Sequence, residues 1–430
     1  MKIVYAADNI NRANFGCRGT STALKQLISE NNTIVADITG ELTHNSGDDN
    51  VFFIPNLPVN YKRHGKKGIC FKLWRKIARK LNHTSPSKYD FVTENPRQSY
   101  QNLIKCLPAN KQLEVFDLRQ YDFDALVING EGTMIMSTPC RRDSLVYLML
   151  AQWAVDLGKK VYYVNAMFSD CTVSGKNKKT LKTSEEVFSK CTLVSVRDPY
   201  SLEYVKENMP GVNAVFVPDA LFTWRKYIDR EALRHNINLA LPFKKEFDQR
   251  LQNVDLTRDY ILISGNSLAI TNVKRAVDSY TALVNYIKSK TNMQVILLEV
   301  CTGDRFLQKV GENTDTPCIP VEIPVLYGLN ILANARVYVS GRFHPSIMAS
   351  LGGTPCVFQG SNSHKTETLG LMLGCESKGA YSAFPDEREF QSIYNDIEEK
   401  ISLGDELRDK ISDNCRKLAQ NAEKIKDLLV

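Results

Sequence analysis

Short apolar runs alternate along the first half of the chain with longer stretches in which apolar residues recur at helical spacing. The runs are rich in β-branched residues and predict strands at residues 3–6, 33–38, 125–129, 161–165, 193–196 and 214–217. Helices are predicted between several of these strands, at residues 21–28, 142–157 and 199–206. This alternation indicates a parallel sheet with helices on both faces.

A polar, charged stretch at residues 225–258 interrupts the alternation, which then restarts. The second half predicts strands at 260–264, 295–299, 337–340 and 355–358, helices at 273–288, 325–333 and 345–351, and a helical tail from 389 to 429. The predicted fold class is therefore α/β, with two doubly wound, Rossmann-like domains facing a cleft. We expect an N-terminal domain at 1–224, a linker at 225–258, a C-terminal domain at 259–385 and C-terminal helices at 386–430.

The composition agrees with packed cores and excludes several classes of protein. Of 430 residues, 43% are hydrophobic and 24% charged, which argues against a disordered chain or a coiled coil. The eleven cysteines form no C-x-x-C pair and no zinc-ligand spacing, so neither a disulfide scaffold nor a structural zinc site is expected. No apolar run is long enough to span a bilayer, and the first residues predict a core strand rather than a leader peptide. We expect a cytoplasmic protein.

The net charge of +7 is concentrated in one segment. Residues 61–89 contain ten lysines and arginines and no acidic residue, within a predicted insertion at 61–108. At 68–81 an apolar stripe that includes Leu73 and Trp74 is flanked by cations, a pattern typical of a helix on an anionic membrane surface. The alternative is a helix packed on the domain with a solvated basic face. No recognition fold accompanies the segment, so nucleic acid is not an expected partner.

Candidate chemistry lies where predicted strands end, because ligands of such sheets bind at the carboxyl ends of strands. Asn14 and Gly16 lie in a turn before a helix expected to start near Thr20, where backbone N–H groups suit a phosphate or a hydroxyl-rich ligand; the alternative is an ordinary turn. Glu131, between two glycines, has little side-chain cover and is expected to be presented to the cleft. It could accept the proton of a sugar hydroxyl or hydrogen-bond that hydroxyl.

Two further strand ends carry charged residues. Arg197 either binds a carboxylate or phosphate with its planar fork or pairs locally with Asp198. Asp219 follows the strand at 214–217, and a structural role in bonding loop backbone is the favoured interpretation.

The strongest candidate site follows the strand at 337–340. Ser340 ends the strand, and Arg342 and His344 precede a helix whose first residue is expected to be Pro345. A cation, an imidazole and backbone donors can then converge on an anion, although a buried core histidine remains the alternative. Lys365 follows the next strand and adds another cation.

Together these segments, and above all the Ser340-Gly341-Arg342-Phe343-His344 motif, resemble the polysaccharide pyruvyl transferase family over residues 2 to 375. The resemblance implies the two-domain GT-B fold and transfer of pyruvate from phosphoenolpyruvate, as co-substrate, onto sugar hydroxyls as a ketal. It also implies that Arg197, Arg342 and His344 contact the donor and that Glu131 lies near the acceptor. No cofactor and no metal are expected.

We therefore expect a transferase acting on a cell-surface polysaccharide precursor, peripheral on the inner face of the membrane. His344 would be the general acid, Glu131 the base and Arg342 the group that stabilises leaving phosphate, with Ser340 and Lys365 in the donor site. Asn14, Gly16 and Asp219 are expected on the acceptor side or in the cleft. The alternatives are a GT-B glycosyltransferase that uses a nucleotide sugar and a non-catalytic membrane-associated scaffold.

Overall fold

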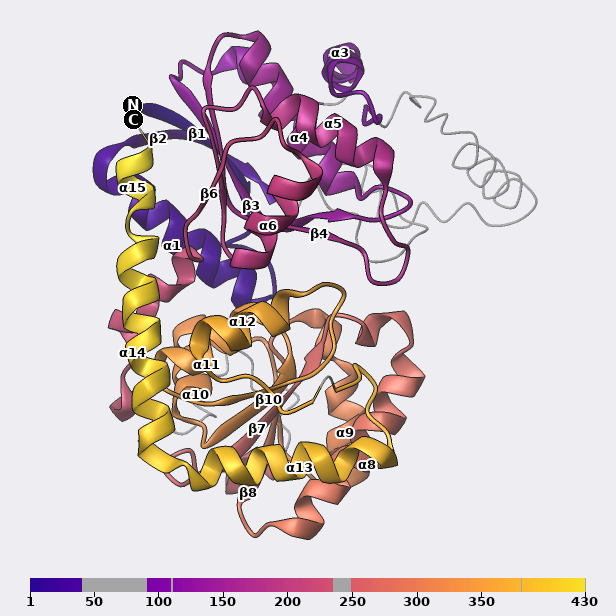
Figure 1. Ribbon diagram of the computed structural model, residues 1–430, viewed down its shortest axis with the longest axis vertical. Helices are drawn as coiled ribbons and strands as arrows, with labels where there is room; N and C mark the ends of the chain where they lie inside the picture. The colour runs from indigo at the N-terminus through magenta and orange to yellow at the C-terminus, as the bar shows by residue number, and fades with distance from the viewer. Residues whose placement is uncertain (41–90, 110, 235–248, 380, 430) are drawn as a thin grey trace, which may run out of the picture. The chain divides into compact units, whose positions relative to one another are not determined.

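The structure is a computed structural model that describes residues 1–40, 91–109, 111–234, 249–379 and 381–429 (Figure 1). Contacts within the chain group it into two compact units. Unit 1 comprises the described residues of Met1–Asn9 and Ile28–Phe216 and the end of the chain from Leu428, and unit 2 comprises those of Ile10–Leu27 and Val217–Asp427.

Unit 1 contains a six-stranded parallel sheet in the order β2-β1-β3-β4-β5-β6. Its strands are β1 (Lys2–Asp8), β2 (Thr33–Thr39), β3 (Ala125–Met136), β4 (Lys160–Asp170), β5 (Leu193–Val196) and β6 (Ala214–Phe216). The longer helices within these sequence ranges are α3 (Pro96–Cys106), α4 (Arg142–Asp156), α5 (Lys178–Phe188) and α6 (Pro199–Asn208). Helix α1 (Phe15–Asn31) contributes its residues up to Leu27 to unit 2 and the rest to unit 1.

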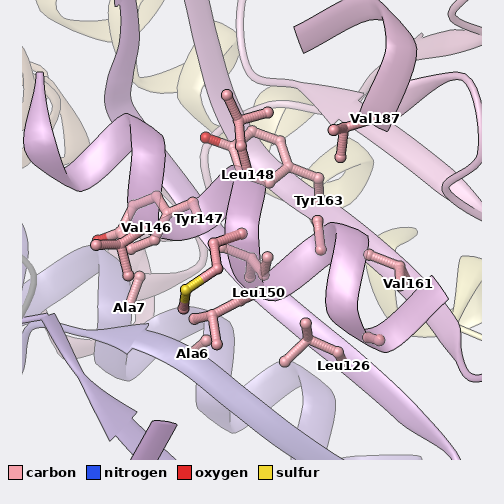
Figure 2. Close-up of a cluster of buried hydrophobic side chains, with 14 of the residues drawn as sticks. Ala6, Ala7, Leu126, Val146, Tyr147, Leu148, Leu150, Val161, Tyr163 and Val187 are labelled. Atoms are coloured by element: carbon pink, nitrogen blue, oxygen red, sulfur yellow. The ribbon is translucent and has the colours of Figure 1, made fainter. Parts of the chain in front are cut away.

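The core of unit 1 lies between its central strands and α4. Alternate residues of β1, β3 and β4, such as Ala6, Leu126 and Tyr163, point to the same face of the sheet and are fully buried. Figure 2 shows them packed against Val146, Leu148 and other side chains from successive positions of α4. Every residue of α4 from Asp143 to Ala154 is buried, so the helix is covered on nearly all sides rather than along one stripe.

Unit 2 contains a five-stranded parallel sheet in the order β11-β10-β7-β8-β9. Its strands are β7 (Tyr260–Asn266), β8 (Gln294–Leu298), β9 (Cys318–Ile319), β10 (Val337–Gly341) and β11 (Cys356–Phe358). Its helices include α8 (Val273–Lys290), α9 (Phe306–Thr314), α10 (Val325–Asn334), α11 (Phe343–Leu351), α12 (Lys365–Leu373), α13 (Glu387–Ser402), α14 (Gly404–Ala422) and α15 (Ile425–Leu428).

Helices cover both faces of the sheet in unit 2. Alternate strand residues that point to one face of the sheet, such as Ile263 and Val339, form a core with side chains of α8, α9 and α13. These three helices are labelled in Figure 1. Strand residues that point to the opposite face contact α10 and α11. The Tyr260 hydroxyl donates to the carbonyl of Ile331 on α10, and the Cys356 thiol lies 3.7 Å from the carbonyl of Ser346 on α11. A parallel sheet covered on both faces is the predicted arrangement, and the predicted α/β class is confirmed.

Several element boundaries differ from those predicted, and three of the differences bear on the candidate site residues. Helix α1 begins at Phe15 rather than near Thr20, because the Asn14 side chain accepts a hydrogen bond from the backbone N–H of Cys17 and caps the helix earlier. Strand β3 continues past Asn129 to Met136, with a register shift after Glu131. Helix α11 begins at Phe343, so Pro345 is its third residue, where a missing N–H is still tolerated.

The division into units also differs from the predicted domains. Residues 10–27, expected in the N-terminal domain, belong to unit 2 because their backbone is tied to the segment after β8: Phe15 N–H donates to the carbonyl of Val300, and Asn14 forms a β-bridge with Cys301. Unit 2 resumes at Val217, near the predicted boundary at 224. The helical C-terminal tail is confirmed.

Three predicted features fall wholly or partly outside the described residues. The basic segment 68–81 lies there, as do most of the insertion 61–108 and part of the linker 225–258. In the described part of the chain, no helix combines the length and apolar character needed to cross a bilayer. No disulfide joins the cysteines within the described ranges.

Candidate active site

The strongest predicted motif lies at the carboxyl end of β10 in unit 2. The buried hydroxyl of Ser340 donates to the carbonyl of Gly265 on β7 (2.8 Å) and accepts the backbone N–H of Arg342 (3.1 Å). Both contacts are with backbone, so Ser340 fixes the chain from which Arg342 projects. Its predicted contact with the donor stays a prediction.

The Arg342 side chain is held by an acid that the sequence analysis did not single out. Nη2 of Arg342 donates to Oδ1 of Asp304 over 2.5 Å, and the Asp304 side chain is fully buried. Burial acts to lower the pKa of Arg342, but the charge and hydrogen bond of Asp304, together with contributions from Cys301 and Tyr338, outweigh it, so the pKa is raised and the guanidinium stays cationic. Nε of Arg342 is buried and has no hydrogen-bond partner among the described residues. The side chain is 18% exposed, so this cation can also meet a ligand.

His344 lies on the first turn of α11, between an acid and a glycine. Its Nε2 is 3.2 Å from Oδ2 of Asp219, whose Oδ1 accepts the hydroxyl of Thr20 (2.7 Å). On the other side, a Cβ added to Gly16 would lie 2.5 Å from the His344 Cβ and 2.7 Å from its Nδ1. Only glycine leaves room for the imidazole here. The His344 side chain is 12% exposed, so it is mostly buried and has Asp219 as a partner, and its role in the site stays a prediction.

Asn14, Gly16 and Asp219 lie in unit 2 with Arg342 and His344. Their predicted place, on the acceptor side or in the cleft, stays a prediction. Asp219 has both roles considered for it. Its Oδ2 contacts His344, and its Oδ1 accepts the backbone N–H of Leu221 (3.0 Å) and caps the 3-10 helix Ala220–Tyr227. Two helix N-termini, those of α1 and α11, meet at the contact of Gly16 with His344.

Lys365, the further predicted cation, is the first residue of α12. Its Nζ donates to Oδ1 of Asn362 (2.7 Å), and the Asn362 N–H donates to the hydroxyl of Ser267, which follows β7. Lys365 is therefore anchored at the same edge of the sheet as the motif after β10.

Glu131 lies in unit 1, and its carboxylate is buried rather than presented as predicted. Because β3 continues through residue 131, neighbouring strands cover the side chain. Its Oε1 accepts amide hydrogens from Asn9 (2.7 Å) and Asn129 (3.1 Å), and Oδ1 of Asn129 accepts the amide of Asn165 (3.1 Å). The two amide donors fix the orientation of the carboxylate.

The backbone around Glu131 is strained on three neighbouring strands. Ala7 on β1, Glu131 on β3 and Asn165 on β4 have φ values of 64°, 40° and 57°. Each non-glycine residue in this left-handed region costs on the order of 1 kcal/mol. Strain of this kind clusters at functional sites, so this edge of the unit 1 sheet is a second candidate region.

Arg197 belongs to this second region. It follows β5, is almost fully buried, and donates its backbone N–H to the carbonyl of Ala166 on β4. A Cβ on Gly132 would lie 3.7 Å from its Nη2, which places the guanidinium beside the residue after Glu131. Asp198 caps α6 by accepting the N–H of Ser201 (2.9 Å). The predicted contact of Arg197 with the donor stays a prediction.

Asp304, Asn9 and Asn165 were not predicted as site residues from the sequence. Asp304 follows β8 closely, so an acid soon after a predicted strand was the available signal. Asn9 follows β1, and Asn165 ends the strand predicted at 161–165, so both offered a similar signal. Within the described ranges, no group of three His, Cys, Asp or Glu side chains could hold a metal ion.

A sequence model of the family described as polysaccharide pyruvyl transferase matches residues 17–362. The match covers most of the chain and includes Glu131, Arg197 and the motif after β10, whereas Asn14, Gly16 and Lys365 lie just outside it. The chain belongs to the polysaccharide pyruvyl transferase family. The predicted resemblance is thereby confirmed, and a search of curated proteins gave no match.

Solved structures show that this pyruvyl transferase family member has a GT-B-like fold. UDP-GlcNAc 2-epimerase from Neisseria meningitidis, bound to UDP-GlcNAc, is 11% identical with a TM-score of 0.53, covering 100% of this chain and 99% of that chain. Arabidopsis thaliana UGT89C1, complexed with UDP-L-rhamnose, is 10% identical with a TM-score of 0.52, again covering 100% and 99%. A likeness at this identity concerns the fold alone, in which two Rossmann-like domains recur.

Proposed function

We propose that this protein transfers pyruvate from phosphoenolpyruvate onto hydroxyls of a sugar in a cell-surface polysaccharide precursor, forming a ketal. The observation that carries the proposal is the placement of Arg342 and His344 at the start of α11, with His344 beside the start of α1. Positive helix ends and a guanidinium suit a ligand with two anionic groups. An imidazole at the same place suits a reaction that needs a proton.

In the proposed reaction, the donor is protonated first, a sugar hydroxyl then adds, and phosphate leaves before the ketal closes. The methylene carbon of phosphoenolpyruvate takes a proton from His344 through the π pair of its double bond, and the central carbon becomes oxocarbenium-like. A sugar hydroxyl adds there and loses its proton to a base, for which we propose Glu131. The C–O bond to phosphate then breaks, the phosphate leaves toward Arg342, and a second hydroxyl closes the ketal as its proton passes to phosphate.

The remaining candidates have narrower roles in this proposal. Arg197 and Lys365 supply further positive charge for the donor, and Ser340 orients Arg342 through its backbone. Neither a cofactor nor a metal ion enters any step.

The decisive experiment supplies labelled phosphoenolpyruvate and candidate lipid-linked sugars and measures phosphate release and label transfer. Acceptor-dependent release is expected, and His344→Ala should lower it at least ~100-fold, the usual scale for one general acid. Near-normal turnover in that variant would remove His344 from the mechanism.

Ligand-induced stabilisation separates this proposal from the alternatives. Phosphoenolpyruvate should raise the melting temperature, because a ligand that binds only the folded state stabilises it. If a nucleoside diphosphate raises the melting temperature and phosphoenolpyruvate does not, the protein is a glycosyltransferase. If neither does, the non-catalytic scaffold is favoured.

We further propose that the protein works in the cytoplasm, peripheral on the inner face of the membrane, through the basic segment 68–81. The support is the sequence pattern of cations beside an apolar stripe. Co-sedimentation with vesicles that contain anionic lipid, but not with neutral vesicles, is the expected result. Equal binding to both would contradict the proposal.

A further inference from the structure

We propose that Asp219 is a positioning residue that fixes the tautomer of His344, so that Nδ1 is the nitrogen that gives its proton to the donor. This inference rests on the proposed function and deepens it, because it names which atom of the imidazole acts and which residue selects it. Asp219 itself contacts neither donor nor acceptor in this scheme.

The hydrogen bonds of Asp219 define the tautomer. The carboxylate is fully buried, and its Oδ1 accepts the Thr20 hydroxyl (2.7 Å) and the Leu221 N–H (3.0 Å). Its Oδ2 lies 3.2 Å from Nε2 of His344. An ionised carboxylate can only accept hydrogen bonds, so Nε2 must carry a hydrogen. A neutral His344 therefore has its lone pair on Nδ1.

The position of Nδ1 agrees with this assignment. It lies on the Gly16 side of the ring, where a Cβ would come within 2.7 Å. Gly16 is the second residue of α1 and His344 the second residue of α11, so Nδ1 lies close to the N-termini of two helices. An anion binds favourably there, which brings a bound phosphoenolpyruvate to Nδ1 rather than to Nε2.

The proton transfer then has a defined balance. The Nδ1–H bond of the imidazolium breaks and its electron pair stays on the ring, while the π pair of the enol forms the new C–H bond. Asp219 holds the Nε2 proton throughout and stabilises the imidazolium form, as the buried aspartate does in catalytic triads. The proton lost by the sugar hydroxyl restores the imidazolium through the base or solvent.

Asp219→Asn tests the inference with a single atomic change. The amide oxygen can keep the two contacts of Oδ1, whereas the amide nitrogen presents a donor to Nε2 in place of an acceptor. We expect the neutral tautomer to switch to Nδ1–H. We also expect turnover to fall at least ~100-fold, while the stabilisation by phosphoenolpyruvate persists.

The tautomer is measured by NMR of the full chain with ¹⁵N-labelled histidine, at a pH where imidazoles are neutral, with the His344 signals assigned from His344→Gln. Thr20→Val is the matched control. This change removes one hydrogen bond to Oδ1 of Asp219 and leaves the contact of Oδ2 with His344, so the tautomer should not change. Turnover should stay within about fivefold of the wild type, the effect of one hydrogen bond.

The outcomes separate the inference from the proposed function. An Nδ1–H tautomer in the wild type, or wild-type turnover in Asp219→Asn, overturns the inference. The NMR measurement needs no substrate, so it decides the tautomer even if Asp219→Asn fails to fold or phosphoenolpyruvate is not the donor. Failure of the proposed function shows instead as a wild type that neither binds phosphoenolpyruvate nor releases phosphate.

Discussion

Arg342 and Asp304 form an ion pair in unit 2, with Nη2 and Oδ1 separated by 2.5 Å. Other groups hold Asp304 in place: its Oδ2 accepts the Val300 N–H (3.3 Å), and a Cβ on Gly265 would lie 2.2 Å from its Oδ1. The carboxylate is thus fixed before any ligand binds, and the guanidinium takes its orientation from it. Preorganisation of this kind lowers the free-energy cost of binding an anion.

Asp304→Asn should therefore weaken donor binding more than it slows chemistry. We expect the KM for phosphoenolpyruvate to rise about tenfold, equivalent to one charge-assisted hydrogen bond, with a smaller change in kcat. The fold should lose about 2 kcal/mol, less than for a fully buried pair because Arg342 is 18% exposed. Steady-state kinetics and urea unfolding measure both effects. An unchanged KM would contradict the positioning role, and Glu312→Gln, in an exposed ion pair with Lys309, is the control.

Gly16 should be indispensable for activity although it lies within a helix, where alanine is normally preferred. In Gly16→Ala the new methyl group would meet Cβ and Nδ1 of His344, so the imidazole must move. We expect turnover to fall about 100-fold, the effect of a misplacement near 1 Å. Phosphate release from phosphoenolpyruvate is the measurement.

Gly19→Ala provides the matched control in the same helix. Its methyl group would meet the ends of the Met348 and Leu221 side chains, which are flexible and can shift. Turnover should change little. Equal losses in Gly16→Ala and Gly19→Ala would mean that packing of α1, rather than the place of His344, sets the requirement.

The comparison of sequence and structure shows which features depend on local pattern. Both parallel sheets were predicted because strand and helix alternate with clear periodicity. Strand β9 was missed because it has two residues, too few for any period to appear. The extension of β3 was missed because glycines at 130 and 132 suggested a turn, whereas the strand continues with Glu131 at positive φ.

The candidate site was predicted where chemistry follows a strand end and missed where it depends on long-range contacts. Arg342 and His344 were found from their motif alone. The pairing of His344 with Asp219 joins residues 125 positions apart, and the pairing of Arg342 with Asp304 joins residues 38 apart. No local pattern contains such contacts. The same reason explains why the contacts that group residues 10–27 with unit 2 were not predicted.

Glu131→Gln should separate acceptor chemistry from donor binding. The amide keeps an oxygen for Asn9 or Asn129 but removes the charge and the capacity to take a proton. If Glu131 is the base, acceptor-dependent phosphate release should fall at least ~100-fold, while stabilisation by phosphoenolpyruvate stays at the wild-type level. Loss of that stabilisation would instead assign Glu131 to the donor. Normal turnover would exclude it as the base.

Another buried carboxyl in unit 2, that of Glu299, should make the stability of the fold depend on pH. Glu299 follows β8 and is fully buried; its Oε2 accepts Nη1 of Arg305 (2.7 Å) and the N–H of Val321 (3.3 Å). Its Oε1 has no hydrogen-bond partner among the described residues. Burial raises the pKa of Glu299 to about 7, although the charge of Arg305 acts to lower it.

Because the pKa of Glu299 is higher in the folded than in the unfolded chain, the folded state binds more protons between these two values. Stability contributed by this group is therefore fully present below the ordinary glutamate pKa of 4.5 and is lost as the pH rises to about 7. The loss amounts to roughly 3 kcal/mol. The free energy of unfolding, measured with urea between about pH 5 and pH 8, should depend less on pH in Glu299→Gln than in the wild type, because the variant lacks the carboxyl that titrates near 7. Glu312→Gln, which removes an exposed carboxylate paired with Lys309, should keep the wild-type slope. Equal slopes in the wild type and Glu299→Gln would mean that Glu299 stays ionised throughout this range.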